Sequence, residues 1–271
     1  MTQQPGHAAR MPFMSCPGNH EGQYDFAPYI ARLRNPIMAG ATAKLAPFYY
    51  SYDYGPVHFI AYSSEHPLTA GSEQFSFIKR DLAAASAPAA RALRPWIVIY
   101  THHPMYCSDL VTWGSRCVSE ANAFRADLAE LMENAGVDIH MSGHNHQYER
   151  THSVTGCVSE TLKAPTNCNI STVVHNHPHP IYIVNGAGGD TEGADPSWTD
   201  DTFAPYRAFH DAGFHTGYGR GSVNKTTFVW EFVYSGTGAI PGTNASHPGT
   251  DDGQVIDRVV LTKGPLGQQQ P

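Results

Sequence analysis

The sequence contains no long apolar run and no excess of basic residues. Its 271 residues include 17 Lys and Arg against 24 Asp and Glu, which gives a net charge of -7 with His neutral. No stretch approaches the roughly 20 consecutive apolar residues that a membrane-spanning helix needs. We therefore expect neither a membrane span nor the basic surface with which proteins bind nucleic acid.

Three further features that would point to a class of protein are missing. No Gly-x-Ser-x-Gly is present, so a nucleophilic serine of the hydrolase type has no support. The glycine-rich run at residues 186–189 is not followed by Lys-Ser or Lys-Thr, which argues against a P-loop and indicates a tight turn. Residues 1–7 are polar and lack the apolar core of a signal peptide.

The apolar residues that are present, 41 % of the total, follow a pattern of strands and helices. The length suits one large domain or two small ones. Strand-like runs lie at residues 11–16, 48–54, 57–62, 96–100, 137–141, 181–184, 227–234 and 255–261, and helical spacing occurs at residues 24–33, 72–85 and 119–135. Strands that alternate with helices predict an α/β sandwich.

Metal-binding residue types follow several of these strand-like runs. In α/β folds, ligands gather beyond the carboxyl ends of the strands. Imidazole nitrogen and amide oxygen suit Zn, Fe, Mn and similar ions. We therefore predict that the side chains at these strand ends close around a shared metal centre. The predicted ligands are Asn19, His102, His144 and His146.

A hydrolytic centre built from such ligands uses two ions about 3.5–4 Å apart, joined by a carboxylate. The ions lower the pKa of water, so that hydroxide is available near neutral pH. His20 is predicted to help the leaving group depart or to orient the phosphate. Each motif alone has a simpler interpretation, as turn chemistry at Asn19-His20 or as a strand-end pair bonded to backbone at His102-His103.

A second histidine-rich run, His175-Asn176-His177-Pro178-His179-Pro180, has the composition of a metal-binding clip. Its two prolines interrupt any regular element. We predict a solvated loop at this position, with no part in the metal centre.

The five cysteines include two closely spaced pairs, each around a loop-like segment. Such spacing favours local disulfides in an oxidising compartment, although five free thiols in a cytosolic protein remain the alternative. The predicted disulfides are Cys107–Cys117 and Cys157–Cys168, and Cys16 is predicted to be a buried thiol.

Three glycosylation sequons also favour the secretory route. They begin at Asn169, Asn224 and Asn244. We expect a secreted, extracellular or secretory-lysosomal protein. Because these traits occur without a signal sequence, we expect that the chain begins partway through a longer protein.

Three motifs together resemble the purple acid phosphatases within the calcineurin-like metallophosphoesterases. They are Gly18-Asn19-His20-Glu21, Tyr100-Thr101-His102-His103-Pro104-Met105-Tyr106-Cys107 and Gly143-His144-Asn145-His146-Gln147-Tyr148-Glu149-Arg150. The resemblance implies an α/β sandwich of two β-sheets flanked by helices. It makes residues 1–263 an incomplete catalytic domain that lacks the N-terminal βαβ part, and residues 264–271 a polar tail.

The resemblance also implies roles for individual residues. Asn19, His102 and His144 correspond to ligands of a divalent ion (Zn, Fe or Mn), and His146 to a ligand of a ferric ion. His20 corresponds to a residue on the phosphate side of the centre. His103 occupies a variable position, so a substrate-binding role for it is left open.

One part of the family pattern is absent from this sequence. The family places Asp-x-Gly and Gly-Asp-x-x-Tyr before the first histidine motif, where they supply an iron-site aspartate, a bridging aspartate and a tyrosinate. The 17 residues before Gly18 include no Asp, Glu or Tyr, and Gly189-Asp190 lacks the tyrosine. Two ions without a bridging anion repel each other. We therefore expect this chain alone to bind at most one ion tightly and to show weak or no activity.

The function that these observations favour is the hydrolysis of phosphate monoesters by a dinuclear metal centre. Two alternatives remain: another dinuclear phosphoesterase, such as a nucleotidase or phosphodiesterase, and a non-catalytic secreted protein on a degraded phosphatase scaffold. Tyr148-Glu149-Arg150 after the histidine motif favours an acid phosphatase.

Overall fold

The structure is a computed structural model that describes residues 12–108, 116–157, 168–189, 198, 204–211, 215–235 and 253–264, with backbone alone at residues 116–120, 122 and 123. The helices are η1 (Asn19–Gly22), α2 (Ala27–Arg32), α3 (Glu73–Ser86), α4 (Pro88–Leu93) and α5 (Arg116–Asn134). The strands are β1 (Tyr50–Tyr54), β2 (Val57–Ala61), β3 (Trp96–Tyr100), β4 (Ile139–Ser142), β5 (Tyr148–Thr155), β6 (Asn169–Ser171), β7 (Ile181–Asn185), β8 (Arg207–His210), β9 (Gly217–Val223), β10 (Thr227–Tyr234) and β11 (Val255–Thr262).

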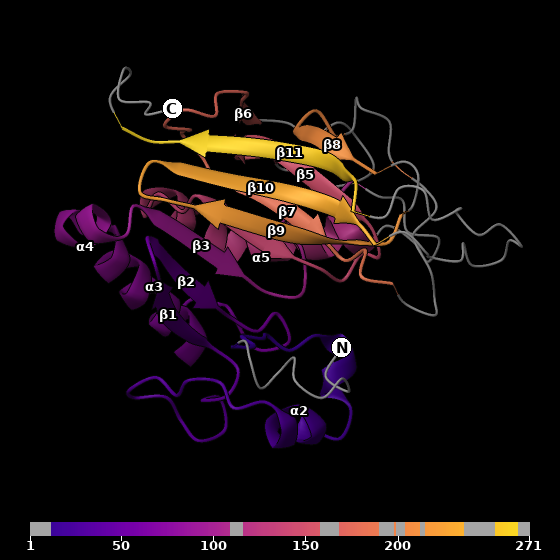
Figure 1. The fold of residues 1–271 in the computed structure, drawn as a ribbon. Coiled ribbons are helices and arrows are strands. Elements are labelled where there is room, and N and C mark those ends of the chain that lie inside the picture. The colour runs from indigo at the N-terminus through magenta and orange to yellow at the C-terminus, as the bar shows by residue number, and fades with distance from the viewer. Residues whose placement is uncertain are drawn as a thin grey trace, which may run out of the picture.

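Two sheets of unequal size organise the described part of the chain (Figure 1). The larger has eight strands in the order β1-β2-β3-β4-β7-β5-β6, with β8 also paired to β5. Its centre, β2-β3-β4-β7, is parallel, and its outer pairs are antiparallel. The smaller sheet is antiparallel, in the order β11-β10-β9.

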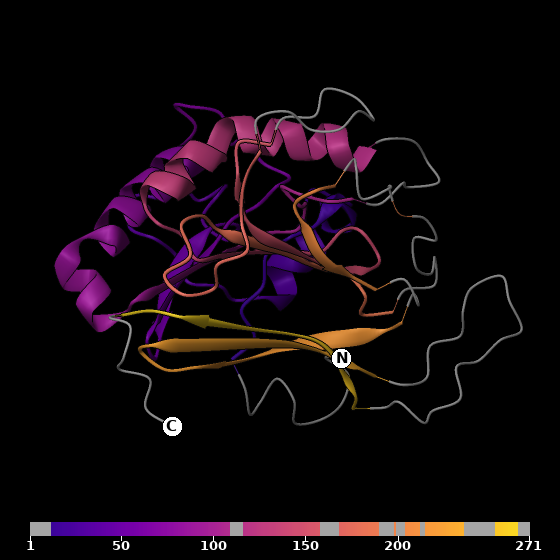
Figure 2. The same ribbon diagram turned by 90° about the horizontal axis from the view of Figure 1, so that it is seen from above.

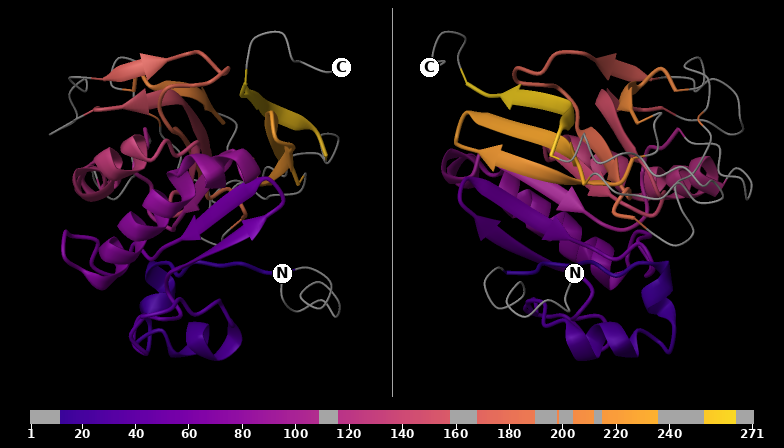
Figure 3. Two further views of the ribbon diagram at one scale, coloured as in Figure 1. Left: turned by 90° about the vertical axis from the view of Figure 1, so that its left-hand side faces the viewer. Right: turned by 45° about the vertical axis from the view of Figure 1, so that its right-hand side comes forward.

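The molecule has three layers, with the larger sheet in the middle. Figure 2 shows α3, α4 and α5 on one side of that sheet and β9, β10 and β11 on the other. The N-terminal segment with α2 lies beyond the end formed by β1 and β2 (Figure 3). This is the α/β sandwich of two sheets that the sequence predicts, with the described helices α3, α4 and α5 on the outer face of the larger sheet.

Strand β3 shows why the larger sheet is covered on both faces. Successive side chains of a strand point to opposite faces. Ile97 and Ile99 pack in the core on the helical side, whereas Trp96 and Val98 pack against the smaller sheet. All four are buried, which is why the run is apolar throughout rather than alternating with polar residues.

Helix α3 begins at a side-chain cap and packs one apolar face on the sheet. The Ser72 hydroxyl accepts a hydrogen bond from the Phe75 backbone amide at 3.2 Å, which satisfies one unpaired amide of the first turn. Phe77, Ile78 and Leu82 recur at helical spacing and are buried in the helix-side core.

A buried carboxylate joins the two sheets. Asp257 on β11 accepts hydrogen bonds from the Tyr148 hydroxyl at 2.7 Å and from Arg150 Nε and Nη2 at 2.7 and 2.8 Å. The Trp230 indole donates in turn to the Tyr148 hydroxyl at 3.1 Å, and the Tyr148 ring stacks on Phe232 with centroids 4.0 Å apart. We call this group the Asp257 clamp. It fixes the start of β5 against the smaller sheet.

The predicted strands and helices mostly agree with the structure. The hairpin at β1 and β2, helices α3 and α5, and strands β3, β4, β7, β10 and β11 lie where the sequence places them, within a few residues. Strands β5, β6, β8 and β9 were not predicted. Their sequences are rich in polar residues or glycine, so they lack the apolar pattern that predicts a strand. Pairing and burial in the two sheets make them strands instead.

One local prediction is wrong and a second holds only in part. The described part of the first strand-like run, residues 12–16, forms no strand. The Ser15 carbonyl accepts hydrogen bonds from the hydroxyls of Tyr29 and Tyr50, so side chains rather than a neighbouring strand satisfy it. The second histidine-rich run is solvated only in part: Asn176 and Pro178 are exposed, as predicted. The His177 side chain, in contrast, is only 2 % exposed and lies 3.5 Å from Asp138.

None of the described helices is both long and apolar enough to cross a membrane. The predicted tail begins at Gly264, and residues 265–271 lie outside the described part of the chain.

Loss of the Asp257 charge should destabilise the fold strongly. Asp257→Asn leaves the half-buried Arg150 without its counter-charge, so we expect the free energy of unfolding to fall by about 3–5 kcal/mol. Urea denaturation measures the change. Glu231→Gln on the same sheet is the control, because its partners Arg220 and Arg258 are more than half exposed. A loss no larger than that of the control would contradict the role of the clamp.

Candidate metal centre

Two neighbouring parallel strands deliver histidines to one edge of the larger sheet. Strands β3 and β4 pair with Tyr100 opposite Met141, and both chains leave the sheet at the same end. Backbone hydrogen bonds continue beyond the strands, from Thr101 N to the Met141 carbonyl at 3.1 Å and from Gly143 N to the His102 carbonyl at 2.9 Å. The residues that follow, His102 and His144, are therefore held side by side.

The N-terminal motif reaches the same place through the short helix η1. Gly18 N donates to Glu21 Oε2 at 2.8 Å and Glu21 N donates to the Gly18 carbonyl at 3.1 Å, which caps the helix. Asn19 Oδ1 then lies 2.7 Å from His102 Nε2. A Cβ at Gly18 would lie 2.8 Å from the His102 ring, so glycine is required for this close approach.

Three imidazoles form a compact cluster. His144 Nδ1 lies 3.2 Å from His102 Nε2. The His103 ring lies over the His144 ring with centroids 3.9 Å apart, and its centroid is 5.2 Å from that of His102. One potential ligand nitrogen from each of the three lies within 4.8 Å of the others. The structure thus brings together Asn19, His102, His144 and His103.

The surroundings favour the neutral form of two imidazoles of the cluster, those of His102 and His144. Burial, together with the charge of His103, lowers the pKa of His102 to about 4. Burial, together with the charges of His103 and His102, lowers the pKa of His144 to about 3. A histidine binds a metal ion only through a neutral ring nitrogen. Both side chains can therefore bind a metal ion well into the acidic range.

The other two predicted histidines lie at the margin of the cluster. His20 is exposed on η1, next to Asn19, and His146 is half-buried in the loop that carries His144. The charge of each lowers the pKa of His102, so both are within electrostatic range of it. Neither belongs to the group of three imidazoles.

Sequence reasoning missed two residues of the loop that follows β2. Ser64 Oγ accepts a hydrogen bond from the His103 backbone amide at 3.2 Å, and Glu65 Oε1 lies 3.3 Å from His103 Nε2. The signal was available, because this loop follows the carboxyl end of a strand that neighbours β3.

A glycine holds the loop of the third motif in place. His144 has a φ of 67°, an uncommon conformation for a residue with a side chain. Gly186 N donates to the Gln147 carbonyl at 3.0 Å. A Cβ at Gly186 would lie 1.8 Å from the Asn145 carbonyl oxygen. The glycine-rich turn after β7 thus lets this loop pack directly against backbone.

The donors of the cluster fit one first-row metal ion. An amide oxygen and imidazole nitrogens are the donors that Zn, Fe and Mn accept. Among the described residues, no carboxylate oxygen belongs to this group of three ligand nitrogens.

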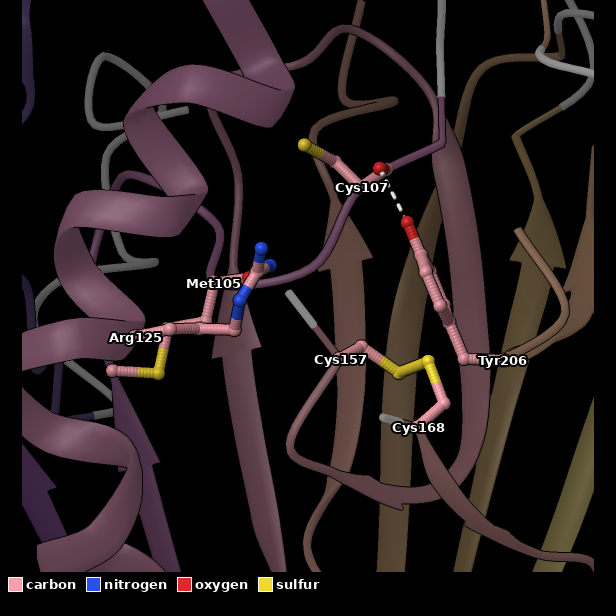
Figure 4. Close-up of a disulfide and its surroundings, with 6 residues drawn as sticks. All are labelled: Met105, Cys107, Arg125, Cys157, Cys168 and Tyr206. Atoms are coloured by element: carbon pink, nitrogen blue, oxygen red, sulfur yellow. Dashed lines mark hydrogen bonds between the residues drawn. A yellow bond between two sulfur atoms is a disulfide. The ribbon is translucent and has the colours of Figure 1, made fainter. Parts of the chain in front are cut away.

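The segment after His103 is held by the surrounding chain (Figure 4). The Tyr206 hydroxyl donates to the Cys107 carbonyl at 2.8 Å, and the Arg125 guanidinium donates to the Met105 carbonyl. Cys107 is disulfide-bonded, and the side chain of its predicted partner, Cys117, lies outside the described residues.

The second predicted disulfide is present. Cys157 and Cys168 are joined, as predicted (Figure 4). Cys16 is a free thiol, as predicted, but its residue is half-buried rather than buried. Loss of solvent around the sulfur raises the pKa of the Cys16 thiol to about 12. Of the sequon asparagines, Asn169 and Asn224 are exposed, and Asn244 lies outside the described residues.

A buried acid lies just beyond the third motif. Glu149 is 1 % exposed and accepts a hydrogen bond from Ser108 N at 2.9 Å. Burial raises the pKa of Glu149 to about 7, although the Ser108 hydrogen bonds and the charge of Arg207 oppose the shift. Glu149 is therefore protonated in the folded protein under acidic conditions.

Two family models match this chain. One, described as "Calcineurin-like phosphoesterase", matches residues 3–148. The other, described as "Iron/zinc purple acid phosphatase-like protein C", matches residues 179–241. The two matches include the histidines of all three motifs and the glycine-rich turn.

Individual relatives carry related names. The chain is 33 % identical over 278 residues to an acid phosphatase type 7 of Danio rerio, covering 94 % of this chain and 55 % of that protein. It is 29 % identical over 231 residues to purple acid phosphatase 18 of Arabidopsis thaliana, covering 82 % and 46 %. The chain thus spans about half the length of these relatives.

A solved structure shows the same fold. It is a purple acid phosphatase from yellow lupin (Lupinus luteus) seeds, with a TM-score of 0.58 and 23 % sequence identity. The match covers 84 % of this chain and 34 % of that one.

Gly186→Ala should displace the loop that carries His144. The new Cβ would overlap the Asn145 carbonyl, and forcing backbone apart in this way costs on the order of 1–3 kcal/mol. Thermal unfolding should show the loss, and binding of Zn²⁺ should weaken. Gly188→Ala is the matched control, since nothing lies within 4 Å of its Cβ. Equal behaviour of the two variants would rule out the proposed close approach.

Glu149→Gln should remove part of the pH dependence of stability. The pKa of Glu149 is raised from its ordinary value of 4.5 to about 7 in the folded state, so its protonated form is favoured by folding. This contribution is complete below pH 4.5 and is lost as pH rises to about 7. Relative to Glu149→Gln, the free energy of unfolding of the wild type should fall by up to about 3 kcal/mol between pH 4.5 and about pH 7. Urea unfolding at several pH values measures the difference, and parallel curves would refute the assignment.

Proposed function

Because this chain belongs to the purple acid phosphatases within the calcineurin-like metallophosphoesterase family, we propose that it supplies the histidine side of a metal centre that hydrolyses phosphate monoesters. The observation that carries this proposal is the convergence of Asn19, His102 and His144. These residues come from three separate segments and meet within hydrogen-bonding distance.

The proposed divalent site consists of Asn19, His102 and His144, and the proposed ion is Zn, Fe or Mn. His146 is proposed to face a second, ferric ion of a dinuclear centre. When bound, the ions supply positive charge that polarises the phosphoryl oxygens and lowers the pKa of water. The neutral state of His102 and His144 at acidic pH supports this assignment, since no proton has to leave before metal binds.

His20 is proposed to act on the substrate. It is exposed on η1, beside a proposed ligand and within electrostatic range of His102. From there its imidazole would donate a hydrogen bond to a phosphate oxygen, or a proton to the leaving group.

The metal-ligand donors among the described residues limit how many ions this chain is expected to bind by itself. The described residues provide an amide and imidazoles for one ion but only His146 for the other, and no carboxylate lies within the cluster. Two unbridged cations at short distance repel each other. We therefore expect one tightly bound ion and weak turnover from this chain by itself.

The proposed location is the secretory route, in an extracellular or lysosomal compartment. The Cys157–Cys168 disulfide supports it, because such bonds persist in oxidising compartments. The exposed positions of Asn169 and Asn224 leave both accessible to glycosylation.

His144→Ala should abolish tight binding of the divalent ion. Loss of a residue that only hydrogen-bonds to a metal ligand typically weakens metal binding by about 10–100-fold. His144→Ala removes a proposed ligand itself, so we expect the affinity for Zn²⁺ to fall by more than about a hundredfold. Isothermal titration calorimetry measures the affinity, and hydrolysis of p-nitrophenyl phosphate reports turnover. His152→Ala on β5 is the control, because this histidine lies outside the imidazole cluster. Unchanged affinity and turnover in His144→Ala would sink the proposed centre.

A further inference from the structure

We propose that His103 is itself a ligand of the divalent ion and that Glu65 holds its ring in the binding orientation. The inference rests on the metal centre proposed above and adds two residues to it. The resemblance assigns His103 no fixed role and does not include Glu65.

The position of His103 places it among the proposed ligands. A nitrogen of its ring lies within 4.8 Å of nitrogens of His102 and His144. Two nitrogens bound to one tetrahedral zinc ion at about 2.0–2.1 Å lie about 3.4 Å apart. The 3.2 Å between His144 Nδ1 and His102 Nε2 is already close to this spacing. A movement of no more than about 1.5 Å would bring the His103 nitrogen to the same spacing.

His103 has a carboxylate partner of the kind that metal-binding histidines usually have. A ligand histidine almost always donates its other ring nitrogen to a carboxylate, a carbonyl or water, which fixes the ring. His103 Nε2 lies 3.3 Å from Glu65 Oε1. With Nε2 directed at Glu65, we assign Nδ1 to the ion.

Glu65 is held firmly enough to orient a ring. The Ser64 hydroxyl donates to Glu65 Oε1 at 2.9 Å, and Glu65 N donates to Ser63 Oγ at 3.2 Å. Ser63 N donates a hydrogen bond to Oε1 of the buried Gln74 at 2.7 Å, and Gln74 Nε2 donates to the Ser63 carbonyl at 2.9 Å. The loop is therefore tied to helix α3, and the Glu65 carboxylate has little freedom to move.

The His103 ring is also restricted by its neighbours. His144 packs on it with centroids 3.9 Å apart, and Phe124 of helix α5 lies 5.6 Å away. Its backbone amide is bonded to Ser64 Oγ. A ring packed in this way and only 10 % exposed pays little further entropy on binding an ion.

The consequence is a site with more nitrogen donors than its sequence motifs indicate. Asn19, His102 and His144 would be joined by a third imidazole. Three imidazoles with an open position form a well-known zinc site. In a cluster without a carboxylate, the added donor would let one ion bind tightly.

Cobalt spectroscopy of the full chain tests whether His103 touches the ion. His103→Cys, loaded with Co²⁺, should gain a near-ultraviolet thiolate-to-cobalt charge-transfer band, because only a directly bound thiolate produces one. His66→Cys is the matched control, since His66 lies in the same loop as Glu65 but bonds to Ser63 and stacks on Phe48 instead. The band should be absent from the control and from the wild type.

Affinities of two further variants complete the test. His103→Gln should weaken Zn²⁺ binding by about a hundredfold or more, and Glu65→Gln by about 10–100-fold through loss of ring orientation. Thermal unfolding without metal confirms that each variant is folded. A missing band together with His103→Gln affinity within about threefold of wild type would overturn the inference.

The comparison with His144→Ala separates this inference from the proposed function. If His144→Ala loses the ion while His103→Gln retains it, the metal centre stands and the assignment of His103 is wrong. If His144→Ala retains the ion as well, the proposed centre itself fails.

Discussion

The arrangement of the molecule depends on one buried carboxylate, that of Asp257. It accepts hydrogen bonds from Tyr148 and Arg150, at the first residues after the loop that carries His144. A buried charge is tolerated only when it is paired and hydrogen-bonded. The smaller sheet must therefore lie where β11 meets β5, and this fixes the direction in which the histidine loop leaves β4. The smaller sheet is thus coupled to the proposed metal centre, although none of its described residues is among the proposed ligands.

The candidate metal centre is formed by three packed imidazole rings. Burial and mutual repulsion lower the pKa values of His102 and His144 to about 4 and about 3, so these two rings offer lone pairs rather than positive charge. The Glu65 carboxylate lies next to it. Burial alone would raise the pKa of Glu65, but its interactions with His103 keep it below its ordinary value. A cation is the natural occupant of such a cluster.

Much of this could be predicted from the sequence, and the exceptions share a cause. The run from Trp96 to Tyr100 is apolar throughout and was recognised as a strand buried on both faces. The strand from Tyr148 to Thr155 was missed, because its polar residues are satisfied by partners far along the chain, such as Asp257. His177 was expected in solvent for the same reason: its burial near Asp138 depends on how distant segments pack.

The sequence by itself determined which donors stand at strand ends, because strand runs and residue types are local properties. Tertiary structure alone decided which of those donors meet. Because the strands lie in the order β2-β3-β4, the segment with His102 and His103 lies between the loop of Glu65 and the loop of His144. It leaves His20 exposed and His146 at the margin. Strand order and side-chain direction depend on long-range packing, which no local pattern encodes.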